Sequence, residues 1–127
     1  MPTLPWTVPN TPPPGAVVHV FASRFETRTL RGALLFFLRT PKVWRQVSRA
    51  PGAYGAALRA QLLRRTFWTV SAWESPKALG EFARGGPHAP VARGLRAQML
   101  DSKFVTWSTT SGELPVDWTE VARRLDT

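Results

Sequence analysis

His88 is the side chain of this sequence best suited to acid–base chemistry. An imidazole can serve as a general base, a metal ligand or a hydrogen-bond donor near neutral pH. His88, Val91, Ala92 and Leu95 recur at helical spacing, which predicts that His88 lies on the apolar side of a helix. The alternative is a structural histidine that caps a helix or is hydrogen-bonded in the core. For His19, alone on an apolar strand, packing is the expected role.

Aromatic side chains form the second group that could build a site. Of the six tryptophans, Trp68, Trp73 and Trp107 fall on predicted strands, where indole rings can line an aromatic ligand pocket or fill a core. Arg24, on the first predicted strand, could pair with a carboxylate or phenolate of a ligand, or could be an ordinary exposed arginine. The predicted catalytic residues are His88 and Trp73, and the predicted substrate-binding residues are Tyr54, Phe82, Arg24 and Trp68.

Several reaction classes are disfavoured by what the sequence lacks. The absence of cysteine removes disulfides, thiolate metal sites, iron–sulfur clusters and a cysteine nucleophile. The histidines and acidic residues show no metal-ligand spacing, so we predict no metal. No G-x-S-x-G motif surrounds a serine, and no Gly-rich phosphate loop follows a predicted strand. Hydrolase, dehydrogenase and kinase functions are therefore poor candidates.

The formal charge of +9 arises from 17 basic and 8 acidic residues. Six basic residues surround the first predicted helix and could bind nucleic acid or an anionic membrane surface. The aromatic and glycine signature of RNA-binding sheets is absent from residues 66–73. We therefore favour a solvated basic helix face and predict no nucleic-acid partner. The six residues are Arg28, Arg31, Arg39, Lys42, Arg45 and Arg49.

A chain of 127 residues is long enough for one core and too short for two ordinary domains. Residues 1–15 are rich in proline, which predicts an extended arm, and residues 16–127 are expected to form one domain. No run of 18 apolar residues exists, so no membrane span is expected. The start of the chain does not resemble a signal peptide, and we expect a soluble, cytoplasmic protein.

Hydrophobic periodicity predicts the elements that must position these residues. Alternating apolar residues indicate strands at 17–25, 53–62, 66–73 and 104–109. Helical spacing begins after Thr29 and ends or kinks near Thr40-Pro41, with a further turn that includes Trp44 and Val47. Further helices are expected from Pro76 to the Gly85-Gly86 pair, from near Pro87, and at 116–125 with Asp117 as a cap.

The order strand, helix, strand, strand, helix, strand, with a closing helix, is typical of an α+β fold of the ferredoxin-like, split βαβ kind. Its antiparallel sheet is expected to have four strands. Helices on one face would leave the other face bare, although the strands carry apolar residues on both sides. Packing of that face against a second copy predicts a homodimer.

Three stretches of the sequence resemble a known superfamily. They are Ala50-Pro51-Gly52-Ala53-Tyr54-Gly55, the strand 67–75 ending in Ser71-Ala72-Trp73-Glu74-Ser75, and the helix from Leu79 to Phe82 with Gly86-Pro87-His88-Ala89. Together they resemble the dimeric α+β barrel superfamily of antibiotic-biosynthesis monooxygenases, and in particular the small domains related to spheroidene monooxygenase. The resemblance covers roughly residues 17–109.

This resemblance implies a homodimer whose sheets close into a barrel, with a pocket between the sheet and the helices of each subunit. Its members include cofactor-free oxygenases of aromatic polyketides and haem-binding or haem-degrading proteins. The implied function is a small monooxygenase-like or tailoring enzyme for a hydrophobic, aromatic substrate, with no cofactor. In that chemistry His88 would deprotonate a phenol, and Trp73 and Tyr54 would orient its ring.

Two alternatives remain open. One is a haem-dependent oxygenase or haem-binding protein with His88 as the axial ligand. The haem-degrading members use an asparagine, a helix tryptophan and a helix histidine, whereas here Asn10 lies in the arm, Phe82 occupies the approximate tryptophan place, and His88 comes earlier in the chain. The other alternative is a non-catalytic module that binds a ligand or a partner. The identity of the substrate is not determined by the sequence.

Overall fold

The computed structural model describes residues 3–86 and 88–126. All the predicted strands and helices are present in this part of the chain, although Pro87, near which the sequence predicts the start of the third helix, lies outside it. The elements are β1 (Thr3–Thr7), β2 (Val17–Thr27), α1 (Leu30–Val47), β3 (Ala53–Gln61), β4 (Thr66–Trp73), α2 (Pro76–Arg84), α3 (His88–Gln98), β5 (Met99–Thr110) and α4 (Trp118–Leu125).

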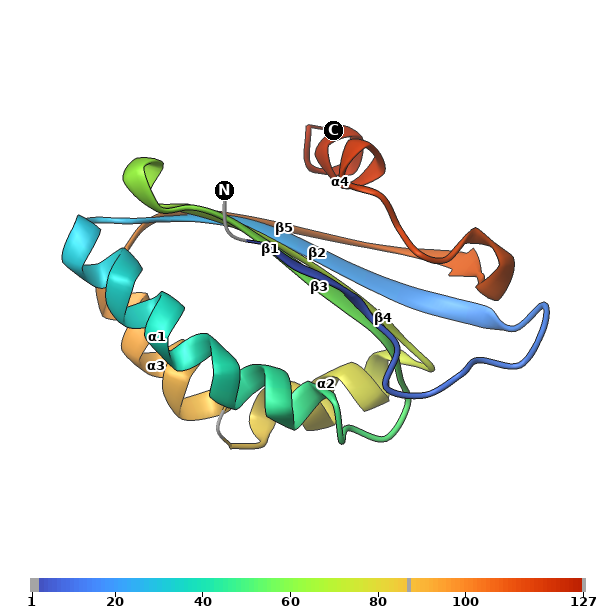
Figure 1. The fold of residues 1–127 in the computed structure, drawn as a ribbon. Helices are drawn as coiled ribbons and strands as arrows, with labels where there is room; N and C mark the ends of the chain where they lie inside the picture. Colours follow the sequence, from blue (N-terminus) through green and yellow to red (C-terminus); the bar gives the residue numbers. More distant parts are fainter. Residues whose placement is uncertain (1–2, 87, 127) are drawn as a thin grey trace.

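The strands form one antiparallel sheet in the order β1-β3-β4-β2-β5. α1 connects β2 to β3, while α2 and α3 connect β4 to β5, and all three helices cover the same face of the sheet (Figure 1). This arrangement confirms the α+β, ferredoxin-like split βαβ fold. Among the described residues the sheet has five strands instead of the predicted four, because the N-terminal segment contributes β1.

β1 is fixed to the edge of β3 by an indole and an amide. A Cβ atom at Gly55 would overlap the indole of Trp6, so that only glycine lets this ring lie flat on β3. Further along, the Asn10 amide donates hydrogen bonds to the carbonyls of Ala50 and Ala53, both at 3.0 Å. Part of the proline-rich arm therefore belongs to the sheet, and a domain boundary after residue 15 remains a prediction.

α1 continues through the proline at which the sequence predicts an end or a kink. Pro41 cannot donate a backbone hydrogen bond, yet the helix runs on to Val47. The Thr40 hydroxyl donates to the Phe36 carbonyl at 3.0 Å within the same turns. Trp44 and Val47, after the proline, pack against the core, so tertiary contacts outweigh the local cost.

α2 begins and ends where the sequence predicts. Ser75 is its N-cap, with the hydroxyl oxygen accepting a hydrogen bond from the Ala78 N–H at 3.1 Å, and Pro76 takes the first helical position. Gly85 is the C-cap. The helix therefore delivers Phe82 and Ala83, in its last turn, to the underside of the sheet at a fixed position.

The second face of the sheet is covered by α4, which corrects the expectation of a bare face (Figure 1). Val121 and Leu125 are almost completely buried, and they pack with Val18, Val20 and Ala72 of the sheet. Further cover comes from Trp6 and Trp118. The apolar residues of this face are therefore enclosed within one chain.

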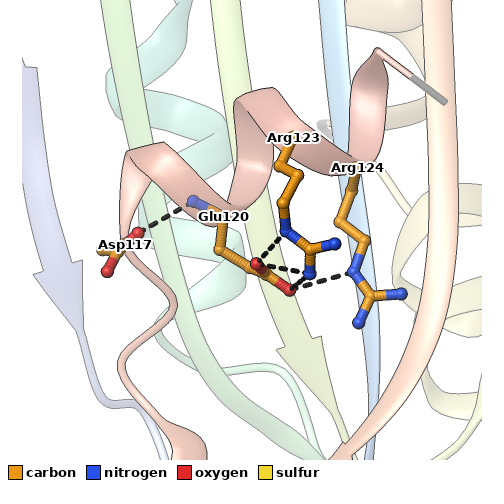
Figure 2. A network of polar contacts seen from close by, with 4 residues as sticks. All are labelled: Asp117, Glu120, Arg123 and Arg124. Atoms are coloured by element: carbon orange, nitrogen blue, oxygen red, sulfur yellow. Dashed lines mark hydrogen bonds and ion pairs between the residues drawn. The ribbon is translucent and has the colours of Figure 1, made fainter.

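Polar contacts within α4 stabilise the helix itself (Figure 2), and a cation–π contact joins it to β5. Asp117 caps the helix by accepting from the Glu120 N–H at 2.8 Å. The Glu120 carboxylate accepts hydrogen bonds from Arg123 and Arg124, and the Arg124 guanidinium lies 4.8 Å from the centre of the Trp107 ring on β5. No helix among the described residues is long and apolar enough to cross a membrane.

Candidate functional site

A cavity of about 520 Å³ lies between the sheet and the layer formed by α1, α2 and α3. Most of its lining is aliphatic or aromatic. The polar groups of the lining include the hydroxyl groups of β2 and β4 on its floor and His88 in its helical wall. Arg96 and Lys103 also contribute to the lining. An apolar cavity with a few convergent polar groups is the usual form of a small-molecule site.

The floor follows from the alternation of side chains along the strands. Ser23 of β2 and Thr69 of β4 are directly paired in the sheet and point to the helical side, where their hydroxyl oxygens lie 2.6 Å apart. Ser71, two residues further along β4, accepts a hydrogen bond from the Trp73 indole Nε1 at 2.8 Å. The sequence analysis did not single out these three hydroxyls, although the strand pattern places them on the face of Trp73.

An aromatic wall joins three of the predicted site residues. The ring centres of Trp73 and Phe82 are 5.1 Å apart, and those of Phe82 and His88 are 4.9 Å apart. Trp73 is fully buried, and Phe82 and His88 are half-buried. The rings come from β4, α2 and α3, so the predicted grouping of these residues depends on how the helices pack on the sheet.

Hydrogen bonds determine the state of the His88 ring. Its Nδ1 lies 3.0 Å from the carbonyl oxygen of Ala83. A carbonyl can only accept, so Nδ1 carries the proton of the neutral ring and Nε2 carries the lone pair. His88 thus has the tautomer of a general base or a metal ligand that acts through Nε2.

Gln46 of α1 is a positioning residue that the sequence analysis missed. Its Oε1 accepts a hydrogen bond from the His88 backbone N–H at 2.6 Å, and its Nε2 donates to the Phe82 carbonyl at 2.9 Å. One amide therefore ties the end of α2 and the start of α3 to α1. No local sequence pattern predicts this role, because Gln46 lies 42 residues from His88 and 36 residues from Phe82 in the chain.

Tyr54 and Trp68 lie on the opposite face of the sheet, which corrects the prediction of one pocket shared with His88. Both pack against the cluster beneath α4. A register shift between Ala53 and Gly55 turns Tyr54 to that side. Trp68 follows simple alternation, since its neighbours Phe67 and Thr69 face the helices.

Arg24 contributes to the cavity lining, but its guanidinium is directed to the α4 side. Its Nη1 lies 3.9 Å from the Asp126 carboxylate, at the end of α4. The side chain is about 39% exposed. This ion pair gives Arg24 a partner other than a ligand in the cavity of His88.

The chemistry available in the cavity is acid–base catalysis on an apolar ligand. Nε2 of His88 can take up a proton, the hydroxyls of Ser71 and Thr69 can hydrogen-bond a polar edge of the ligand, and the aromatic wall can stack on a planar ring. The described part of the chain holds no group of three histidine, cysteine or acidic residues close enough to bind one metal ion.

Solved structures with the same fold include a cofactor-independent oxygenase and proposed monooxygenases. A proposed antibiotic biosynthesis monooxygenase from Nitrosomonas europaea superposes with a TM-score of 0.65 at 15% identity, covering 75% of this chain and 91% of that one. SnoaB from Streptomyces nogalater, a cofactor-independent oxygenase, gives a TM-score of 0.56 at 21% identity, covering 77% and 97%.

A further proposed antibiotic biosynthesis monooxygenase, from Chloroflexus aurantiacus, gives a TM-score of 0.57 at 11% identity and covers 73% of this chain and 91% of its own. No protein-family model and no curated protein matches the sequence. At these identities the structural likeness establishes the fold.

Proposed function

Because the chain has the fold of the antibiotic biosynthesis monooxygenases, we propose that it is a small oxygenase that acts on a hydrophobic, aromatic substrate. The observation that carries the proposal is His88, whose Nε2 lone pair is set by the Ala83 hydrogen bond and which lines a largely apolar cavity. No cofactor is required in this proposal. The cofactor-independent activity named for SnoaB supports that choice.

The proposed reaction begins with proton transfer. Nε2 of His88 accepts the proton of an electron-rich phenol, and the phenolate supplies the electrons that reduce molecular oxygen. One oxygen atom becomes bonded to a ring carbon and the other leaves as water, so that a CH₂ group and O₂ give a C=O group and H₂O. Trp73 and Phe82 orient the ring, and the Ser71 hydroxyl binds its polar edge.

A hydroxyanthrone such as dithranol is a suitable probe, because it combines a phenol with an oxidisable CH₂ group. Oxygen uptake and quinone absorbance are measured for the wild type, His88→Ala and the control His19→Ala. We expect His88→Ala to lower kcat/KM by roughly 100-fold or more, as for loss of a general base, and His19→Ala to retain activity. Equal rates for the wild type and His88→Ala would overturn the proposal.

Haem binding is the second candidate, because the same Nε2 lone pair could serve as an axial ligand. Hemin is titrated into the wild type and His88→Ala, and the Soret band is followed. A saturable shift that requires His88 favours the haem candidate. Without that shift, saturable dithranol binding with no turnover would identify a non-catalytic binding module.

A homodimer is the assembly that we propose. Because α4 occupies the second face of the sheet, the contact is assigned to the edge strand β5, where Leu100 is 52% and Phe104 is 69% exposed. Light scattering should give about twice 14.2 kDa for the wild type and the control Val17→Thr. Phe104→Lys should give the monomer mass. A monomeric wild type at micromolar concentration would contradict this assembly.

A further inference from the structure

The outer face of α1 carries leucines that the fold leaves exposed. Leu30, Leu34 and Leu38 recur every four residues, and they are 45%, 46% and 72% exposed. Leu35 adds a fourth at 41%. The inner face of the same helix supplies Phe36 and other residues that pack on the sheet, and the leucines lie outside that contact.

Cations surround this leucine ridge. Between residues 27 and 73 the sequence contains no aspartate or glutamate. Four exposed residues of α1 are basic: Arg31, Arg39, Lys42 and Arg45. Lys42, Arg45 and Arg49, which follows the helix, line an open hollow of about 590 Å³. Glu81 is the acidic residue in the lining of that hollow. α3 adds two arginines and no acidic residue.

We propose that the outer face of α1 is a docking surface for an anionic lipid bilayer. Exposed leucines can enter the boundary between headgroups and acyl chains, while arginines and lysines among them bind the anionic headgroups. A nucleic acid would match the charge but would leave the leucines in water. Figure 1 shows α1 and α3 on the side of the sheet remote from α4, so the bilayer would lie against the helical layer that encloses the cavity.

The test uses the full chain and vesicles made either of phosphatidylcholine or of phosphatidylcholine mixed with phosphatidylglycerol. Cosedimentation should occur with the anionic vesicles and should weaken as salt is raised. The double variant Leu34→Ser with Leu38→Ser should lower the partition coefficient about tenfold. The control Val17→Thr replaces an exposed apolar side chain outside α1, where Val17 is 70% exposed. This variant should bind vesicles as the wild type does.

A second variant tests the charges separately. Lys42→Gln with Arg45→Gln should weaken binding about thirtyfold, because each of the two cations contributes about 1 kcal/mol near an anionic surface. Circular dichroism verifies that both double variants remain folded. Absence of vesicle binding by the wild type would overturn the proposal, as would binding that neither double variant weakens. Salt-sensitive binding to DNA or RNA in place of vesicles would assign the charges to a nucleic acid.

Discussion

At the residue scale, a single amide organises the candidate site. His88 lines the cavity, its Nδ1 is hydrogen-bonded to the Ala83 carbonyl, and the start of its helix is held by Gln46. Gln46 also bonds the Phe82 carbonyl, so the same side chain places the ring that stacks against His88. Neither contact changes the chemistry of the imidazole, but together they set its position.

Gln46→Ala should therefore act as the loss of a positioning residue. We expect the free energy of unfolding to fall by about 1 kcal/mol, because the part-buried His88 N–H loses its acceptor and the Phe82 carbonyl loses one of its donors. With dithranol, kcat should fall while the pH profile of the rate stays that of the wild type. Urea denaturation and the pH profile measure the two effects, with Gln61→Ala as the control. An unchanged kcat would show that Gln46 has no part in the site.

At the element scale, one strand and one helix lie outside the split βαβ core. They are β1 near the N-terminal end and α4 near the C-terminal end. β1 extends the sheet beyond β3 through the contact of Trp6 with Gly55, and α4 covers its second face. Both elements depend on specific partners far away in sequence. The contribution of each can therefore be tested by one substitution at its contact point.

Gly55→Ala should displace β1, because the new methyl group overlaps the Trp6 indole. Overpacking of this kind costs about 1–3 kcal/mol. Hydrogen exchange should show faster exchange of the β1 amides, and urea denaturation should show the lower stability. The matched control is Gly112→Ala, since a Cβ at that position meets no atom within 4 Å. Equal stability of the two variants would contradict the packing of Trp6 on β3.

The Glu120 network should make α4 sensitive to acid. Hydrogen bonds from Arg123, and then from Arg124, hold the pKa of Glu120 below its ordinary value of 4.5. A carboxyl group whose pKa is lower in the folded state stabilises the fold above its ordinary pKa, and this contribution is lost as the pH falls through the folded value.

The Tm of the wild type and of Glu120→Gln is therefore measured as a function of pH. The Tm difference should be full above pH 4.5 and should shrink as the pH falls below that value. Glu113→Gln, an exposed carboxylate on the turn after β5, is the control. A Tm difference that stays constant down to about pH 2 would exclude this role for Glu120.

At the scale of the whole molecule, the sheet is covered on both faces by its own chain. Clusters under α1, α2 and α3 fill one side, and the cluster under α4 fills the other. The cavity of His88 lies on the first side only. Stability is therefore shared between the faces, while the proposed chemistry is confined to one.

Leu125→Ala should lower the stability of the whole chain, because this side chain is 1% exposed beneath α4. Removing a buried leucine typically costs about 2–5 kcal/mol. Urea denaturation followed by tryptophan fluorescence and by circular dichroism should shift together, as expected if both faces unfold with the sheet. Leu63→Ala, at a side chain that is 90% exposed, should leave the midpoint unchanged. Different midpoints for the fluorescence and circular dichroism signals would show that α4 unfolds separately from the sheet.

The sequence by itself determined the fold class and every element except β1, because hydrophobic periodicity and caps such as Ser75 and Asp117 act within a few residues. Side chains alternate along a strand, and this separates Trp73 from Trp68, but the prediction placed both in one site and was wrong for Trp68. The cysteine-free composition removed thiol chemistry without reference to any contact.

Only the tertiary structure decided which of these residues share a cavity. A register shift in β3 places Tyr54 outside the predicted pocket. Gln46 of α1 is hydrogen-bonded to His88 of α3, and α4 covers the face that was expected to be bare. These outcomes depend on strand pairing and helix packing between distant parts of the chain. Local patterns carry no such information, because the energy of each contact exists only once both partners are in place.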